Sequence, residues 1–408
     1  MKTRLVLASC FVALGACQAY AEPMFLSKQY TRCTTCHYSP TGGGLLTPYG
    51  RSLSRQELST TGKDRSPSKS SVGSDVEGAA LYQQGLQAQQ AGDYTRAAEL
   101  FGSAVSAFSP QTHHEEAPLW GIFGDKLGPL QVGFEVRPLN FSVDAEGSVR
   151  EPVDLGVLAA YRVNAWTVYG EGASQPQSQG WTVDWHEYWV GRQADNGIGF
   201  RVGRFLPAYG IRFAEDAFTR NNLGLDEASQ VYGLEVSRTS DRYLTQVSVS
   251  PGLADSIIHD DGRRAFTATG RLQIDLSSRN VIVASGLYRN TSSLEARNGA
   301  GGIAFGFAPT RRLSVWTEAD AQFEQGMGRG YILVNETACE TFRGLWLKFS
   351  PQVRTVTGDT STRVFGMRLD ADLLLRTHWK VYLSYYREGD PVNNLVMNTF
   401  RAQLHLYL

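Results

Sequence analysis

From about residue 129 to the last residue, apolar and polar side chains alternate with a period of two, the pattern of β-strands whose two faces differ. A soluble sandwich buries the apolar face of such strands. A transmembrane barrel turns that face toward lipid and lines a wet lumen with the polar face. The alternation alone therefore leaves both architectures open. Its clearest stretches place on one face Trp181, Val183, Trp185 and Trp189; Phe365, Met367, Leu369, Ala371 and Leu373; and Phe400, Ala402, Leu404 and Leu406.

The lengths of the connections favour the barrel. The region 129–408 divides into about 16 strands, and bacterial outer-membrane barrels have an even number of antiparallel strands. Short connections near residues 162, 239, 308 and 376 alternate with longer ones at 143–152, 172–180, 250–263 and 350–362. Outer-membrane barrels have short periplasmic turns and longer external loops. We therefore predict a mainly β fold, a porin-like outer-membrane β-barrel of about 16 antiparallel strands.

The longest connection, 207–228, follows the fifth predicted strand and is thus the third external loop. The corresponding loop of porins folds into the lumen and narrows it, and we expect the same here, with an ordinary solvated loop as the alternative. Eight Trp and many Tyr fit the aromatic girdles of a barrel, although they also fit a lectin-like sandwich. The charged residues expected to flank the constriction are Arg204, Arg212, Glu215, Asp216 and Arg220.

The N-terminus has the pattern of a secretion signal. Lys2 and Arg4 precede an apolar run, and Ala19 and Ala21 form an A-x-A cleavage site, so we assign residues 1–21 to a signal peptide. A competing lipoprotein box would leave Cys17 acylated. The signal predicts export across the inner membrane of a bacterium. The net charge of −1 gives no indication of a nucleic-acid partner.

Residues 59–128 are predicted to be a linker that contains one helical hairpin. The stretch after residue 59 is rich in Ser, Gly and Lys, which is linker composition. Residues 77–108 then show helical spacing with a central turn and resemble a single tetratricopeptide repeat. One copy cannot bury its own apolar face. The hairpin is therefore a spacer, or it packs on another part of the chain or on a partner.

A C-x-x-C-H motif lies at residues 33–37, within a segment 22–58 that we assign as a monohaem c-type cytochrome segment. In this motif Cys33 and Cys36 add to the vinyl groups of one haem c, and His37 is the proximal iron ligand. A zinc site would need a second suitably spaced Cys/His pair, and a thioredoxin-like dithiol would need an α/β pattern; neither is present. Cys339 has no partner cysteine and is expected to have no functional role.

The sixth iron ligand cannot be assigned from the sequence. Its candidates before the barrel are Met24, His113 and His114, and the candidates on predicted lumen faces are His186 and His405. Each of these histidines is also explained as an ordinary polar residue of a linker or of a barrel lumen. We expect an apolar wall for the haem from Leu45, Leu46 and Tyr49, and propionate partners among Lys28, Arg32, Arg51 and Arg55.

The front of the chain resembles the fused outer-membrane cytochrome–porins of iron-oxidising bacteria over about 35 residues. That family has A-x-P-x-F, then C-x-x-C-H, then a stretch ending in L-x-P-F/Y-G-R. The family's F-A-R is Phe25-Leu26-Ser27 here, and the linker is longer than in the compact members. The matching residues are Ala21, Pro23 and Phe25; Cys33, Cys36 and His37; and Leu46, Pro48, Tyr49, Gly50 and Arg51.

The resemblance implies a single haem c, in the periplasm or in the barrel lumen of an outer-membrane protein. It further implies that electrons pass from extracellular Fe(II) to a periplasmic electron carrier, so that the protein acts as an Fe(II) oxidase. A solute porin that carries a periplasmic haem domain for anchoring or sensing is the alternative. A peroxidase is a third hypothesis, but no distal acid–base constellation is visible for it.

Overall fold

The computed structural model is described for two parts of the chain. The first comprises 23–54, 58–60, 80–85, 87–88, 96, 99–101 and 103–104. The second runs from 129 to 407 with gaps at 145–146, 151–153, 178–179, 195, 214–216, 226–229, 252–264, 292–295, 325–327, 359–360, 377–378 and 391–394. The predicted signal peptide and His113 and His114 lie outside the described residues.

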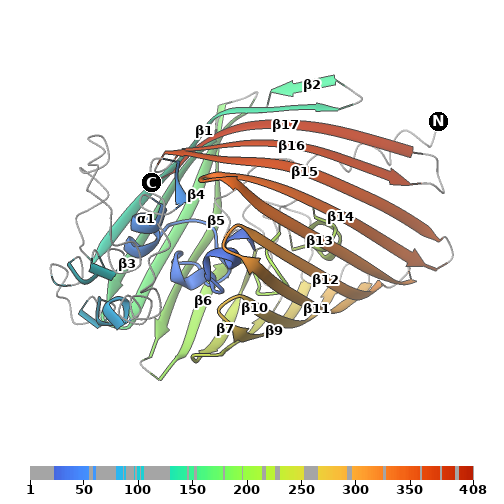
Figure 1. Cartoon of the computed structure of the whole chain (residues 1–408). Coiled ribbons are helices and arrows are strands. Elements are labelled where there is room, and N and C mark those ends of the chain that lie inside the picture. The colour runs from blue at the N-terminus through green and yellow to red at the C-terminus, as the bar shows by residue number, and fades with distance from the viewer. Residues whose placement is uncertain are drawn as a thin grey trace.

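The second part is one antiparallel sheet of long, tilted strands (Figure 1). The strands are β1 (Leu130–Asp144), β2 (Gly147–Arg150), β3 (Asp154–Val163), β4 (Trp166–Gln177), β5 (Gly180–Gln193), β6 (Ile198–Phe205), β7 (Val231–Thr239), β8 (Tyr243–Ser250), β9 (Ala265–Ser277), β10 (Asn280–Thr291), β11 (Ala296–Thr310), β12 (Leu313–Glu324), β13 (Gly328–Phe342), β14 (Leu345–Thr357), β15 (Thr362–Arg376), β16 (Trp379–Asp390) and β17 (Leu395–Tyr407).

The sheet closes into a barrel because its first and last strands pair. Asn140 on β1 lies opposite Gln403 on β17. The strands β2 and β3 pair with successive stretches of β1, so these two segments share one position in the barrel. The 17 segments therefore make a barrel of 16 strands, and the predicted fold class is confirmed. Closure leaves no unpaired sheet edge, which a membrane-spanning sheet requires.

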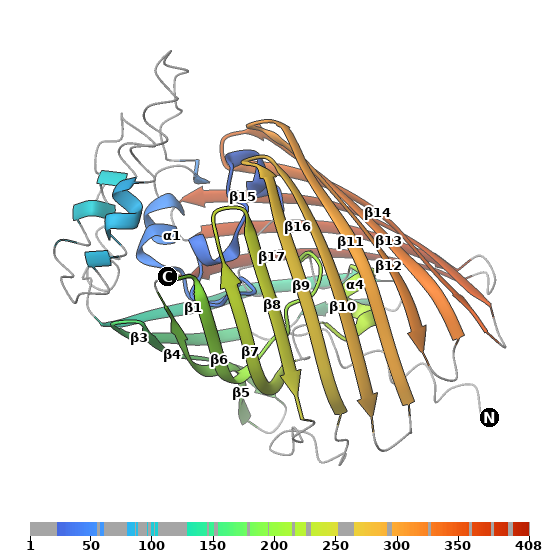
Figure 2. The same cartoon turned by 90° about the horizontal axis from the view of Figure 1, so that it is seen from below.

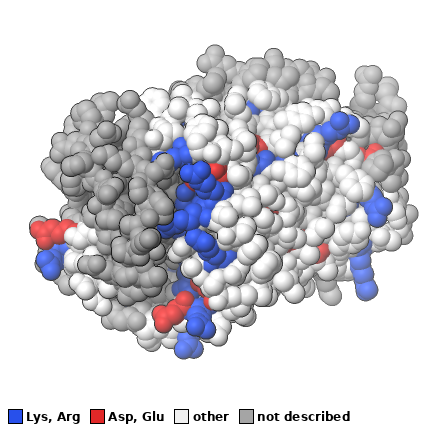
Figure 3. Space-filling model, viewed as in Figure 1, with Lys and Arg blue, Asp and Glu red and all other residues white. Residues whose placement is uncertain are grey.

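The two faces of the strands differ as a transmembrane barrel requires. Leu369 points outward and is 45% exposed, whereas its neighbours Arg368 and Asp370 are buried on the lumen side. The face of the wall that Figure 3 shows is largely uncharged, and Lys and Arg gather near one end of the barrel. Exposed aromatic residues form a belt near each end, as in barrels whose rings lie at the lipid headgroups. One belt has Tyr161, Trp166, Tyr243, Phe307, Phe342 and Trp379, and the other has Trp185, Phe266, Tyr288, Phe323, Tyr331 and Phe365.

A β-bulge corrects one prediction about the faces. Opposite Glu171, strand β5 contains one residue more than β4, and the register shifts there. A one-residue insertion moves all later side chains to the other face. Trp185 is accordingly 53% exposed on the outside, whereas Trp189 is 7% exposed and stacks on Tyr169 in the lumen, with ring centroids 5.2 Å apart. The prediction that Trp185 and Trp189 share a face is therefore wrong.

Three of the short connections lie where they were predicted, as tight turns at 164–165, 240–242 and 311–312. The fourth lies between the paired residues Arg376 and Trp379, and its residues 377–378 lie outside the described residues. Three of the predicted long loops are wrong in part. In the first, residues 147–150 form strand β2. Strand β4 continues to Gln177 and β14 to Thr357, so most of 172–180 and much of 350–362 are strand. These strand extensions are polar because they do not face lipid. They need a hydrogen-bonded partner strand but no apolar face.

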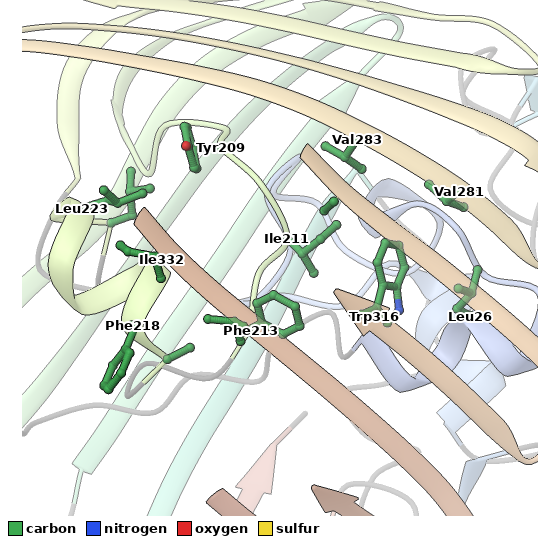
Figure 4. Close-up of a cluster of buried hydrophobic side chains, with 14 of the residues drawn as sticks. Leu26, Tyr209, Ile211, Phe213, Phe218, Leu223, Val281, Val283, Trp316 and Ile332 are labelled. Atoms are coloured by element: carbon green, nitrogen blue, oxygen red, sulfur yellow. The ribbon is translucent and has the colours of Figure 1, made fainter. Parts of the chain in front are cut away.

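The connection between β6 and β7, residues 206–230, is called loop L3 below, and it folds into the lumen as predicted. The hydroxyl of Tyr209 donates to Asp320 on β12 at 2.7 Å, and the amide of Phe218 donates to Gln352 on β14 at 2.8 Å. Loop L3 includes the short helix α4 (Phe218–Leu223). Its apolar side chains Tyr209, Ile211 and Phe213 pack in one cluster with the barrel wall (Figure 4).

Only part of the predicted constriction can be located. Arg204 and Arg212 are buried inside the barrel. Glu215 and Asp216 lie outside the described residues, as does the side chain of Arg220. Arg204 donates to the carbonyl of Trp185 and, at 3.4 Å, to Gln230, so it holds the two ends of the loop to β5.

Residues 23–60, as far as they are described, are called the N-terminal plug. They contain η2 (Pro23–Lys28), η3 (Cys33–Thr35) and α1 (Pro48–Leu53). Both views place this blue segment within the end of the barrel that holds the C-terminus and the short turns (Figures 1 and 2). Short turns are periplasmic in outer-membrane barrels. No helix among the described residues is long and apolar enough to cross a membrane.

Candidate functional site

The C-x-x-C-H motif forms one tight turn in the plug. The amides of Cys36 and His37 both donate to the carbonyl of Cys33, at 3.1 and 2.9 Å. This turn directs both cysteines and the histidine to the wall of one cavity. Cys33 and Cys36 are free thiols. The two intervening residues thus place both sulfurs at the same edge of the site, as covalent attachment of one porphyrin requires.

A glycine-rich hairpin follows the motif. The amide of Tyr38 donates to the carbonyl of Leu45 at 3.0 Å, and His37 and Leu46 form a β-bridge. Between these arms, Gly42, Gly43 and Gly44 have φ angles of 82°, 79° and 59°. Side chains are strained in this left-handed region, so glycine allows the reversal. The backbone of His37 is therefore held by the turn before it and by the bridge to Leu46 after it.

The cavity beside the motif has an empty volume of about 1120 Å³. Its apolar lining includes Phe25, Leu46, Leu53 and Leu58. The plug, which supplies these four residues, lies in the end of the barrel that holds the short turns (Figure 2). Of the three residues expected to form an apolar wall, Leu46 lines the cavity. Leu45 packs instead with Tyr169 and Trp189 on the barrel wall, and Tyr49 packs on Tyr82.

The environment of the cavity keeps the ligating groups neutral. Burial and the positive charge of Arg212 together lower the pKa of His37 to about 4, against the opposing effects of the Gly43 and Gly44 backbone and the charge of Glu135. Burial also raises the pKa of the Cys33 thiol, against Arg271 and Arg212. A neutral imidazole is the form that binds a metal. His37 is therefore held in its ligating state over the physiological pH range.

Two candidates for the sixth ligand line the same cavity, Met24 and His405. Met24 is fully buried against Trp346 and Ala338. The Nε2 atom of His405 lies 3.5 Å from the carboxylate of Glu135, across the seam between β17 and β1. His186 is buried in the barrel but is not part of the cavity lining.

The cations predicted as propionate partners are engaged by the barrel wall. Lys28 pairs with Glu340 at 2.5 Å, and Arg32 pairs with Asp275 at 3.0 Å. Arg51 donates to the carbonyl of Val132 at 3.2 Å. Arg55 lies outside the described residues.

Three other cations line the cavity: Arg212 from loop L3, Arg271 from β9 and Lys380 from β16. In the sequence, Arg271 and Lys380 are indistinguishable from ordinary lumen-facing residues of their strands. Only the tertiary structure brings their charges to the cavity wall.

The plug is fastened to strands around the whole circumference. Hydrogen bonds to four strands illustrate this. Trp316 of β12 donates to the carbonyl of Pro23 at 2.8 Å, Gln273 of β9 donates to the carbonyl of Thr31 at 2.8 Å, Glu187 of β5 accepts from Ser39 at 2.9 Å, and Tyr407 of β17 bonds Ser54 at 3.4 Å. The barrel thus holds the motif inside its periplasmic end.

The helical hairpin contacts the plug through Tyr82. The hydroxyl of Tyr82 donates to the carbonyl of Thr35, between the two cysteines, at 3.4 Å, and its ring lies 4.4 Å from that of Tyr49. Phe101 of the second helix lies 5.7 Å from Tyr82. A Cβ atom at Gly85 would be 2.7 Å from the Phe101 ring, so glycine permits the close packing of the two helices. The hairpin therefore contacts the turn that carries the two cysteines, through Tyr82.

These residues fit a covalently bound haem c. The cavity offers two thiols at one edge, a neutral imidazole, an apolar wall and cations within its rim. A haem held there would have thioether bonds to Cys33 and Cys36 and His37 as its proximal ligand. Arg212, Arg271 and Lys380 also line the cavity, and their positive charges would offset the negative charge of its propionates.

Comparisons with known proteins give the fold. No protein-family model matches the chain, and no curated protein matches it in sequence. Solved structures of outer-membrane porins do match. A loop-deletion mutant of OmpT from Vibrio cholerae has a TM-score of 0.55 and 9% identity, covering 69% of this chain and 100% of that one.

Two further porins match equally well. OmpF of Salmonella typhi, in complex with daunomycin, has a TM-score of 0.56, 8% identity and coverage of 68% and 97%. The anion-selective porin from Comamonas acidovorans has a TM-score of 0.52, 10% identity and coverage of 68% and 99%. The barrel therefore has the fold of outer-membrane porins, which supports a location in the bacterial outer membrane.

Proposed function

We propose that the protein is an outer-membrane c-type cytochrome–porin that passes electrons across the outer membrane. The observation that carries this proposal is the C-x-x-C-H cavity, which lies inside a porin-type barrel between loop L3 and the helical hairpin. Ile211 and Arg212 of loop L3 form part of its wall, and Cys36 packs with Tyr82 of the hairpin. A redox centre at this place would contact elements that lead to both sides of the membrane.

The chain's own residues supply attachment, orientation and exclusion of water. Cys33 and Cys36 would bind a haem c, which supplies a one-electron redox centre. His37 would orient it, and Met24 or His405 would close the second axial position. The apolar wall around Leu46 and Leu53 keeps water from the cavity. The donor proposed from the family resemblance is extracellular Fe(II), which gives one electron, and the acceptor is a periplasmic carrier, which takes it.

The experiment uses proteoliposomes with a periplasmic-type cytochrome trapped inside and Fe(II) added outside. The trapped cytochrome should become reduced with the wild type. His37→Ala should insert normally, because the barrel pairs its own backbone, but should lose this reduction. If the wild-type protein ignores external reductants and responds only to internal ones, electron transfer across the membrane is excluded.

A second function, a solute porin with a haem-bearing periplasmic domain, is favoured by the likeness to diffusion porins. It requires an open lumen. Within the lumen, the plug is bonded to β12 and loop L3 to β14, so both narrow it, which supports the electron-transfer proposal instead. Conductance in planar bilayers separates the two functions.

A further inference from the structure

The side chain of Arg212 joins loop L3 to the glycine-rich hairpin of the plug. Its Nη1 atom donates to the carbonyls of Gly42 and, at 3.3 Å, Thr41. A Cβ atom on Gly43 would lie only 3.0 Å from the same guanidinium, so glycine leaves room for the Arg212 side chain against the hairpin. Loop L3 is thus in direct contact with the segment that carries His37.

The opposite side of this hairpin is fixed by the barrel wall. The amide of Leu45 donates to the hydroxyl of Tyr169 at 3.3 Å, and this hydroxyl donates to Glu171 at 2.6 Å. A Cβ atom at Gly44 would collide with both Tyr169 and Glu171. The hairpin is therefore clamped, with strand β4 on one side and Arg212 on the other.

The backbone connects this clamped hairpin to His37. The β-bridge between His37 and Leu46 ties the two arms together, and Gly43 and Gly44 lie in the turn that joins these arms. A residue that orients a metal ligand tunes the bound metal even without touching it. Any shift of residues 41–44 would turn or tilt the imidazole plane.

We propose that Arg212 is a positioning residue, through which loop L3 fixes the orientation of His37 and thereby the redox potential of the haem bound at Cys33 and Cys36. This inference rests on the proposed function. It adds that an external loop, and not only the plug, determines the properties of the redox centre.

The test compares Arg212→Ala with Arg289→Ala in the purified full-length protein that carries covalent haem. Arg289 is the matched control, because it also holds loop L3, by donating to the carbonyl of Gly224 at 2.8 Å, but lies away from the cavity lining. The midpoint potential is measured by spectroelectrochemistry and the axial geometry by the electron paramagnetic resonance g-values of the oxidised protein.

Arg212→Ala should lower the midpoint potential, because a positive charge favours the reduced form, and should also shift the g-values. Arg289→Ala should change neither. Arg212→Lys should restore part of the potential through its charge but leave the g-values shifted, because an ammonium cannot reproduce the guanidinium fork.

Unchanged g-values in both Arg212 variants, with normal haem content, would overturn the positioning role even if the potential moved. If the Arg212→Ala protein does not fold, Arg212→Lys still allows the measurement, because lysine preserves the positive charge in the buried site. A wild-type protein without covalent haem would instead overturn the proposed function, and this inference with it.

Discussion

The hydroxyl of Tyr82 donates a hydrogen bond to the carbonyl of Thr35, the residue that directly precedes the second cysteine of the C-x-x-C-H motif. The helical hairpin, 47 residues further along the chain, thus reaches the peptide that sets the spacing of the two thiols. Docking of the hairpin and access to the motif from the periplasm are therefore linked.

Replacement of Tyr82 tests this link. Tyr82→Ala removes the ring contacts with Tyr49 and Phe101, and aromatic pairs contribute about 0.5–1.5 kcal/mol each. We expect docking of the hairpin to weaken by about 1–3 kcal/mol. Limited proteolysis of the purified protein should then cut the hairpin faster. Tyr82→Phe keeps the rings and should cost at most about 1 kcal/mol. Equal cleavage rates in all three proteins would contradict docking through Tyr82.

Covalent attachment depends on two thiols. Cys33→Ala with Cys36→Ala should abolish haem staining of the denatured protein, because the third thiol of the described residues, Cys339, is exposed on β13 and is not part of the cavity lining. Cys339→Ala is the matched control and should retain full staining. A haem stain that survives the double substitution would refute the assigned attachment site.

The conductance of the barrel should be low because the plug fills its periplasmic end. Deletion of residues 23–128, with the signal peptide retained, should raise single-channel conductance severalfold in planar bilayers, while loop L3 continues to narrow the lumen. Heat-modifiable migration in electrophoresis verifies that the shortened barrel folds. High conductance of the intact protein would favour the solute-porin function.

Protonation of His37 should release the plug when no haem is bound. The pKa of His37 is about 4 in the folded protein and about 6.5 when the residue is free, so between these values the unfolded segment binds more protons than the folded one. Stability of the docked plug is therefore complete above pH 6.5 and decreases as the pH falls toward 4, by about 3 kcal/mol in total.

Tryptophan fluorescence can follow this release, because Trp316 bonds Pro23 and Trp346 packs on Phe25 with centroids 6.2 Å apart. The double cysteine variant supplies haem-free protein. Its fluorescence should change between pH 6.5 and 4, and a further His37→Gln substitution should remove most of that change. A transition that persists unchanged in the His37→Gln protein would assign it to other groups.

The local pattern of the chain predicted the barrel, its strand number and the inward course of loop L3, because alternation and connection length are local properties. The β-bulge opposite Glu171 was not predictable, because one extra residue in β5 leaves no mark on the composition of the sequence. The place of the plug was not predictable either. It depends on contacts such as that of Trp316 with Pro23, which are 293 residues apart.

The contacts of the plug with the first and last strands bear on how the barrel opens and closes. Arg51 bonds β1 through Val132, and Ser54 bonds β17 through Tyr407, so one short helix bridges the two strands that meet at closure. Separation of these strands must break both contacts. Closure of the barrel and entry of the plug are thus coupled equilibria, each favouring the other by the same free energy. A plug with bound haem would then oppose the separation of β1 and β17, and so the lateral opening of the barrel wall.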